Sequence, residues 1–499
     1  MSPRALPVSL ILSAAVGCAV GPRYSRPEIP VPRAWQEAPS PGVPARGPSL
    51  ERWWAAFHDP ILDGLVARAV EGNLDLKIAA ARIREARAAR GIAAAAALPQ
   101  VGVEGTYART KRSDAVPPFN SSLGGPSPFG PREQNAFESG FDAGWEIDVF
   151  GGVRRDKEAA LAQFQAAEEA RRDVLVTLLA DVARNYAELR GVQRQVLILE
   201  DTLRSEEDTL QLARARLDAG LGAELDVARA EGLLNANASQ RPVLERLAKQ
   251  TVYRLGVLLG RDPGALASEL EAPGAIPGPP EVPLTLPSEL LSQRPDLRRA
   301  ERELAAATAL VGVARADLFP RFSILGSLGR RSENAGDLSS SVSQFWAVVP
   351  QVRWPIFSGG RIRANIRVQD ARQEQALLQY ERSVLTALEE VENALSSHTR
   401  ELRRQASLRV SVAANHRALE LATDRYTSGL ESFLSVLDAE RSVYAAEDQL
   451  VQSERNAVVS LIAVYKSLGG GWLLGDAAPE APRSSLQEDS VRDLTGHGQ

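Results

Sequence analysis

Residues 153–219 read VRRDKEAALAQFQAAEEARRDVLVTLLADVARNYAELRGVQRQVLILEDTLRSEEDTLQLARARLDA. The segment contains no proline and only one glycine, Gly191, so nothing in it interrupts an α-helix. Hydrophobic residues recur at every seventh position: Leu175, Val182, Leu189, Val196, Leu203, Leu210 and Leu217. A strict seven-residue period is typical of coiled coils. The segment therefore predicts one helix, about 100 Å long at 1.5 Å per residue, packed lengthwise against other helices.

The same plan occurs twice in the chain. Residues 216–221 (RLDAGL) correspond to 425–430 (RYTSGL), and residues 149–152 (VFGG) correspond to 356–360 (IFSGG). Gly220 and Gly429 follow the two long helices, where a glycine in the left-handed conformation commonly ends a helix. The chain is therefore an internal duplication.

Repeat 1 covers 72–261 and repeat 2 covers 288–470. Each repeat is predicted to contain an opening helix, a β-hairpin, a long helix and a return helix. In repeat 1 the last three elements are expected at 98–150, 153–219 and 223–259. In repeat 2 they are expected at 320–357, 361–427 and 432–468. Pro242 should kink the first return helix because proline removes a helical hydrogen bond.

The remaining segments read as processing and connecting sequence. Residues 1–17 resemble a bacterial signal peptide, with Arg4 before a short apolar run, and residues 15–18 (AVGC) resemble a lipobox. Cys18 is then the lipidated first residue of an anchored segment and equatorial region over 18–71; the alternative is a plain signal with an incidental cysteine. Residues 262–287 hold seven prolines and are expected to be an extended equatorial linker, not a helix, and 471–499 a disordered tail.

Composition excludes several functions. The 58 basic and 63 acidic residues are interspersed, with a net charge of −5, so we expect no nucleic-acid binding. One cysteine and four scattered histidines exclude internal disulfides and predict no metal site. No P-loop, GxSxG or dinucleotide fingerprint is present, and no nucleophile–base arrangement can be assembled. We therefore expect no enzyme activity and no cofactor.

Strand-like alternation marks both hairpins, as at Val101, Val103 and Tyr107. Strands of this length fit an outer-membrane barrel, although a soluble hairpin shows the same alternation. The two hairpins supply four strands, too few to close a barrel. Three chains would supply twelve. The predicted fold is mainly α with membrane β, and closure of a barrel requires several chains.

Four segments carry a family resemblance: 18–27 (CAVGPRYSRP), 286–297 (LPSELLSQRPDL), 354–361 (WPIFSGGR) and 436–440 (VLDAE). The chain resembles the TolC-like outer membrane factors, specifically the lipoprotein (NodT-type) branch of RND tripartite efflux systems. The resemblance implies a lipid-anchored homotrimer in the outer membrane of a Gram-negative bacterium, extending into the periplasm. Its expected fold is a trimeric 12-stranded outer-membrane β-barrel continuous with a long periplasmic α-helical coiled-coil barrel, built from an internally duplicated chain. It also implies two partners, a periplasmic adaptor protein and an inner-membrane RND transporter.

The resemblance implies an exit duct for small molecules such as drugs or other toxic compounds. A duct for type I protein secretion and a non-conducting periplasmic scaffold are the alternatives. The lipobox and residues 294–297 (RPDL) favour the efflux branch, and a scaffold would leave the hairpins and the duplication unexplained. The transported substrates are not readable from this chain.

The resemblance places the gate of the duct just after Gly429. Leu434, Asp438 and Arg441 share one helix face because they are spaced by four and three residues. In a trimer, Leu434 would form an apolar constriction and Asp438 a cation-attracting ring of carboxylates. The alternative is that Asp438 and Arg441 are an ordinary solvated pair.

The resemblance also assigns roles to residues near the turns. Tyr426 and Asp226 match positions that link neighbouring helices in the closed state. The adaptor is expected to dock at the two turns, through Gly220 and Leu221 in one and Gly429 and Leu430 in the other.

Overall fold

The computed structural model describes residues 19–37, 50–111, 113, 133–278, 280 and 287–472. It divides into two compact units. Unit 1 contains residues 19–29, the described residues of Ala81–Glu168, and Arg299–Arg382. Unit 2 contains the described residues of Pro30–Ala80, Glu169–Arg298 and from Ser383 onward. The predictions for 1–17 and for Cys18 lie outside the described residues.

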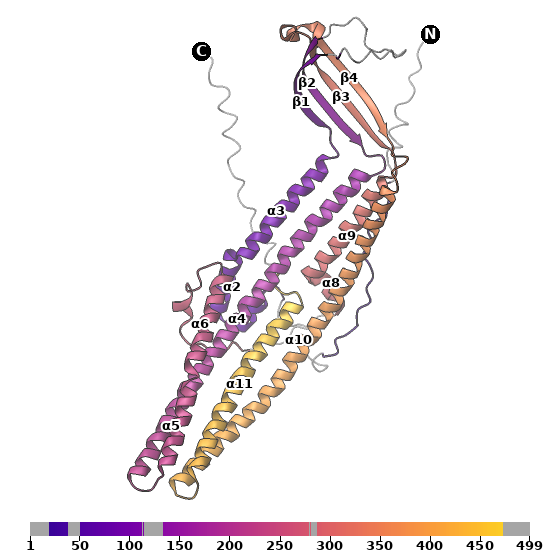
Figure 1. Cartoon of the computed structure of the whole chain (residues 1–499). Helices are drawn as coiled ribbons and strands as arrows, with labels where there is room; N and C mark the ends of the chain where they lie inside the picture. The colour runs from indigo at the N-terminus through magenta and orange to yellow at the C-terminus, as the bar shows by residue number, and fades with distance from the viewer. Residues whose placement is uncertain are drawn as a thin grey trace. The chain divides into compact units, whose positions relative to one another are not determined.

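Unit 1 contains one antiparallel sheet with strand order β1-β2-β3-β4 (Figure 1). The strands are β1 (Gln100–Lys111), β2 (Glu133–Ile147), β3 (Arg321–Ser332) and β4 (Gln344–Arg353). The second strand of repeat 1 pairs with the first strand of repeat 2, so Trp145 lies opposite Ile324 and Phe141 opposite Leu328. The two predicted hairpins are therefore halves of a single sheet.

Large apolar side chains on the sheet are exposed in the single chain. Val103 is 75% exposed and Trp346 is 74% exposed. Exposed apolar surface of this kind marks a contact with a membrane or another protein. The indole nitrogens of Trp145 and Trp354, at equivalent places in the two repeats, donate to the carbonyl oxygens of Ala97 (3.1 Å) and Leu318 (3.0 Å).

The two long helices are α4 (Gly152–Asp218) and α10 (Arg361–Thr427), each of 67 residues. The opening helices are α3 (Leu74–Ala95) and α9 (Pro295–Ala316). The opening helix of repeat 1, which was expected to start with the repeat at residue 72, begins instead at Leu74. Gly72 ends a separate helix, α2 (Pro60–Gly72). Asn73 interrupts the helical backbone between α2 and α3 with a ψ angle of 131°, and its Oδ1 accepts a hydrogen bond from the amide of Leu76 (3.0 Å).

The return helix of repeat 1 is two helices, α5 (Glu224–Ala238) and α6 (Arg241–Leu258). Ser239 and Gln240 between them keep right-handed helical backbone angles, so the predicted return helix is interrupted at a kink. Pro242 lies in the first turn of α6, where a missing amide costs no helical hydrogen bond, and the interruption falls just before it. The return helix of repeat 2, α11 (Phe433–Ser467), is continuous.

The largest core of unit 2 surrounds the middle of α4. The heptad residues Leu175, Val182 and Leu189 are at most 1% exposed in this core. They pack with the 3-10 helix η2 (Leu50–Phe57), α2, α6 and α11, and the ring of Trp53 stacks on that of Tyr465 at 5.0 Å. The predicted heptad face is thus a buried packing face here.

Two predicted coil segments are partly ordered. The linker contains one helical turn, α7 (Ala267–Leu270), because Leu266 and Leu270 are fully buried in the core of unit 2. The linker is followed by a 3-10 turn, η3 (Pro287–Glu289), and a short helix, α8 (Leu290–Gln293). At the start of the predicted tail, the guanidinium groups of Arg172 and Arg298 lie 5.0 Å and 5.1 Å from the ring of Trp472. The rest of that tail lies outside the described residues.

None of the described helices combines the length and the apolar character needed to cross a lipid bilayer.

Candidate gate at the helix turns

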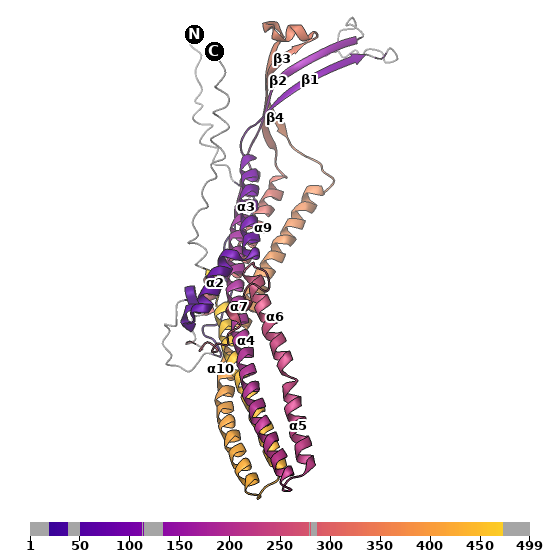
Figure 2. The same ribbon diagram turned by 90° about the vertical axis from the view of Figure 1, so that its left-hand side faces the viewer.

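Two tight turns in unit 2 join α4 to α5 and α10 to α11, and they lie side by side (Figures 1 and 2). Gly220 and Gly429 both have φ of 74°, the left-handed conformation that the sequence predicted. The amide of Leu221 donates to Arg216 O, and that of Leu430 to Arg425 O, both at 2.8 Å. Both long helices therefore end in a Schellman motif, and the hydrogen bonds that end them lie within this chain.

The two turns are packed together by a hydrophobic cluster. Its buried members come from α4, α5, α10 and α11: Leu210, Ala213, Ala230, Leu233, Tyr426, Phe433, Val436 and Leu437. The ring of Tyr426 is 5.1 Å from that of Phe433, and Tyr426 is only 6% exposed. The predicted link through Tyr426 is thus a buried contact within the chain.

Arg216 connects the turn of repeat 1 to the end of α10. Its guanidinium lies 4.6 Å from the ring centroid of Tyr426, and its Nη1 donates to the carbonyls of Tyr426 (3.3 Å) and Thr427 (3.4 Å). A cation is favourable there because a helix C-terminus is the negative end of the helix dipole. Burial raises the pKa of Tyr426, the Arg216 charge lowers it and Asp226 raises it, which places Asp226 near the same ring.

The three predicted gate residues lie on α11. Leu434 is 43% exposed, and Nη1 of Arg441 is 3.6 Å from Oδ1 of Asp438, with both of these side chains more than half exposed. The structure therefore brings Asp438 and Arg441 together in a solvated ion pair, next to an exposed leucine. Such a pair contributes less than about 1 kcal/mol to folding.

The gate face belongs to repeat 2 alone. At the equivalent places in repeat 1 stand Leu225, Arg229 and Gly232. The exposed leucine is retained there, at 56% exposure, but the carboxylate is replaced by a cation and the arginine by a glycine. At these three positions, only the α10–α11 turn can therefore supply a ring of carboxylates, through Asp438.

The residues predicted for adaptor docking are exposed. Leu221 is 72% and Leu430 is 68% exposed. In the α10–α11 turn, Glu431 accepts hydrogen bonds from the hydroxyl of Ser435 (3.0 Å) and the amide of Ser432 (3.3 Å). The carboxylate of Glu431 thus bonds within its own turn, and it also forms an ion pair with Arg425, whose Nε is 3.5 Å from Oε2.

Reasoning from the sequence missed Arg216 and the buried Glu440. Glu440 is 4% exposed and directly precedes Arg441. The signal was available, because helical spacing from Val436 through 440 to Val443 continues the buried stripe of α11. For Arg216 the sequence offers no comparable signal, since its partners come from the other repeat.

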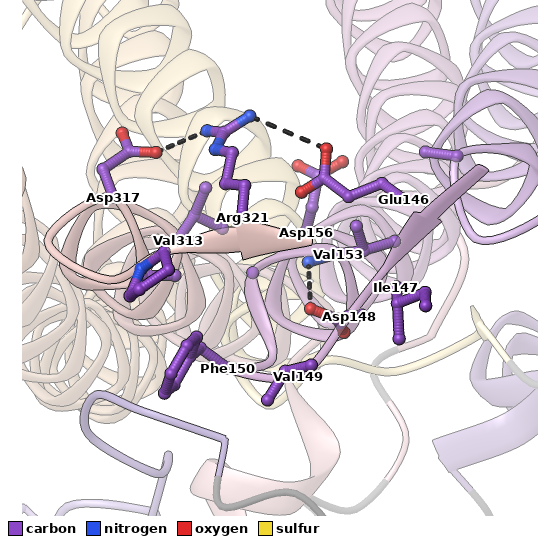
Figure 3. Close-up of a pocket in the computed structure, with 14 residues that line it drawn as sticks. Glu146, Ile147, Asp148, Val149, Phe150, Val153, Asp156, Val313, Asp317 and Arg321 are labelled. Carbon is purple, nitrogen blue, oxygen red and sulfur yellow. Dashed lines mark hydrogen bonds and ion pairs between the residues drawn. The ribbon is translucent and has the colours of Figure 1, made fainter. Parts of the chain in front are cut away.

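A second site is a pocket of about 270 Å³ in unit 1, at the base of the sheet (Figure 3). Arg321 lies between Asp317 (2.5 Å) and Glu146 (3.8 Å), and Asp148 accepts from the backbone amides of Val153 and Arg154 at the start of α4. The charged groups of this pocket therefore bond to one another and to backbone amides where strands meet helices. Among the described residues, no three His, Cys, Asp or Glu side chains are grouped to hold a metal ion. The turns are therefore the stronger candidate for a functional site.

Curated relatives match nearly the whole chain. A solvent efflux pump outer membrane protein of Pseudomonas putida, SrpC, is 33% identical over 476 residues, covering 94% of this chain and 98% of the relative. A pyoverdine export outer membrane protein of Pseudomonas putida, OpmQ, is 34% identical over 469 residues, covering 94% and 97%.

Solved structures agree with these relatives. The outer-membrane channel OprN superposes with a TM-score of 0.84 at 38% identity, covering 91% of this chain and 100% of that chain. CusC superposes with a TM-score of 0.79 at 28% identity, again covering 91% and 100%. The model of the outer membrane efflux protein family matches residues 65–261 and 286–470, which are the two repeats. The chain thus belongs to the outer membrane efflux protein family and is an outer-membrane exit duct of a tripartite efflux pump.

Proposed function

We propose that this duct exports small toxic organic compounds and that its gate is the Leu434–Asp438–Arg441 face of α11. The substrate class follows the names of relatives, which include solvent, toluene and antibiotic efflux pump proteins. The observation that carries the gate is the exposed leucine beside a solvated ion pair, on a turn whose own packing is already complete.

In a trimer, three copies of this face converge on the duct axis. Three Leu434 side chains form an apolar ring, which resists wetting and so blocks ions. Three Asp438 carboxylates make the entrance attractive to cations. Arg441, 3.6 Å from Asp438, offsets the repulsion between the carboxylates and favours the closed ring.

Opening comes from the adaptor, which engages the turns at Gly220, Leu221, Gly429 and Leu430. The exposure of Leu221 and Leu430 gives a helical hairpin an apolar contact at each turn. The adaptor in turn connects the duct to an inner-membrane RND transporter. The duct itself performs no bond chemistry and needs no cofactor.

We expect the purified protein to give a small, cation-preferring conductance in a planar bilayer. Asp438→Asn should reduce the cation preference because it removes the carboxylate ring. Glu224→Gln, an exposed acidic residue in the first turn of α5, is the matched control and should leave the preference unchanged. No conductance from protein shown to be folded and inserted would contradict the duct, and equal cation preference in Asp438→Asn would contradict the ring.

We also propose that Cys18 carries the lipid anchor. The amide of Val20 donates to Phe150 O (3.1 Å), at the connection between β2 and α4, so the chain after Cys18 is held at the base of the sheet. An acylated cysteine there needs no long tether to reach a membrane leaflet, and two or more acyl chains make a lasting anchor. Cys18→Ala should abolish labelling by radioactive fatty acid. Labelling that survives the substitution would contradict the anchor.

A further inference from the structure

A buried carboxyl group lies directly behind the gate face. Glu440 on α11 is 4% exposed, and its Oε1 accepts a hydrogen bond from the hydroxyl of Thr209 on α4 at 2.5 Å. Its Oε2 is buried and has no hydrogen-bond partner. A carboxylate in this position lacks the hydration that it has in water, so its ionised form is disfavoured.

A second buried carboxyl group shares the region. Glu206, one turn before Thr209 on α4, is 2% exposed, and its Oε1 accepts from Nδ2 of Asn237 on α5 at 2.5 Å. Its Oε2 is likewise buried without a hydrogen-bond partner. Two carboxyl groups from facing helices therefore each leave one oxygen unsatisfied in the dry interior.

The charges around the pair explain how it titrates. Burial raises the pKa of Glu440, the hydrogen bond from Thr209 lowers it and the charge of Glu206 raises it, so that the pKa of Glu440 is about 7. Burial also raises the pKa of Glu206, while Asn237 and the Arg441 charge lower it.

The neighbouring elements contribute few other charges. On α11, burial and the charges of Asp448 and Glu206 raise the pKa of Tyr444. On α10, the exposed His416 lies 2.8 Å from Glu447 of α11. The α5 helix contributes the neutral Asn237. Arg441 thus acts on two acids at once, Glu206 inside and Asp438 on the gate face.

We propose that Glu440, together with Glu206, is a proton-dependent latch that holds α11 against α4 and so positions the gate face. The proposal rests on the gate proposed above. With a proton bound, the pair carries at most one negative charge and α11 stays packed on α4. When Glu440 ionises, two buried negative charges repel across the α4–α11 contact. Water enters, α11 moves from α4, and Leu434, Asp438 and Arg441 move with it.

The direction of the pH effect follows from linkage. An acid whose pKa is raised in the closed state binds a proton more tightly there than in an open, hydrated state, so acid favours closure and rising pH favours opening. If opening returns Glu440 to its ordinary pKa, the open-to-closed ratio rises on the order of 100-fold between about pH 4.5 and pH 7. Above pH 7 the ratio should level off, because Glu440 is then ionised in both states.

The test is the open probability of the full-length protein in planar bilayers between pH 5 and pH 8. Wild type should open more as the pH rises toward 7. Glu440→Gln, which mimics the protonated acid in shape, should stay closed with a flat profile. Glu231→Gln is the matched control, because Glu231 occupies the same place in repeat 1 but forms an exposed ion pair with Arg214 at 2.6 Å; it should keep the wild-type profile.

Two further variants separate the latch from other causes. Thr209→Val removes the hydrogen bond that favours the ionised form, so the midpoint of the profile should move to higher pH. Asp438→Asn should change selectivity and still open more as the pH rises, because Glu440 stays buried and bonded to Thr209. A flat wild-type profile, an unchanged profile in Glu440→Gln or an unmoved midpoint in Thr209→Val would overturn the latch. Failure of the gate is seen separately, as an unchanged conductance in a variant lacking both Leu434 and Asp438.

Discussion

The Leu434→Ser/Asp438→Ser double variant should conduct about tenfold more than wild type, a change that corresponds to about 1.4 kcal/mol in the barrier to passage. Leu434 is exposed and Asp438 makes only a solvated pair, so neither substitution disturbs the buried cluster of the two turns. The two serine side chains make the constriction polar, so that water can fill it. The substitution at Asp438 also removes the carboxylate that pairs with Arg441. The conductance should therefore increase without loss of folded trimer.

The repeat supplies a matched control for this experiment. Leu225→Ser changes the equivalent exposed leucine of repeat 1, where Arg229 stands in place of Asp438, and its conductance should remain near that of wild type. High conductance in wild type at pH 5, where the latch holds the gate closed, would place the gate elsewhere in the duct. Equal, low conductance in the double variant would show that this face does not close it.

The main elements of the fold were predictable because they depend on local patterns. The heptads of α4, the absence of proline and the glycine at each turn specify two 67-residue helices and their left-handed caps. The alternation of Val101 and Val103 similarly marks β1. Where a single side chain changes the backbone, as Asn73 does between α2 and α3, the pattern alone placed the boundary two residues too early.

Contacts between the repeats were not predictable in the same way. The pairing of β2 with β3 joins residues nearly 180 positions apart, such as Trp145 and Ile324, and no local signal encodes it. Arg216 reaches Tyr426, and Thr209 reaches Glu440, across a similar separation. The gate residues were placed on one face by spacing, but their proposed role came from resemblance, since spacing cannot tell a gate from a solvated helix face.

The arginine of the RPDL motif at residues 294–297 has a structural role, because it bonds to three helices. Arg294 is 8% exposed and precedes α9, where its guanidinium donates to Asp296 at 2.7 and 3.0 Å. Its Nη1 donates to Ser467 O (2.9 Å) at the end of α11, and its Nη2 is 2.7 Å from Glu390 on α10. One side chain thus joins three helices in unit 2, using donors on all three guanidinium nitrogens.

Arg294→Ala should lower the free energy of unfolding by about 3 kcal/mol, the lower end of the range for removing one partner of a buried ion pair. The lower end applies because Glu390 is half exposed and keeps much of its hydration. Arg294→Lys should recover only part of the loss, since an ammonium cannot match the planar fork that reaches Asp296 and Ser467 together. Denaturant unfolding, followed by tryptophan fluorescence, measures both.

Arg417→Ala provides the comparison, because Arg417 forms an exposed pair with Glu420 at 3.0 Å on α10. Its loss should change the free energy of unfolding by less than about 0.5 kcal/mol, as for other exposed helical pairs. If Arg294→Ala proved as mild as Arg417→Ala, the three-helix junction would contribute little, and the reason for an arginine at this position would have to lie outside the folded chain. A large loss that Arg294→Lys fully restored would instead show that the charge alone suffices and that the fork geometry is dispensable.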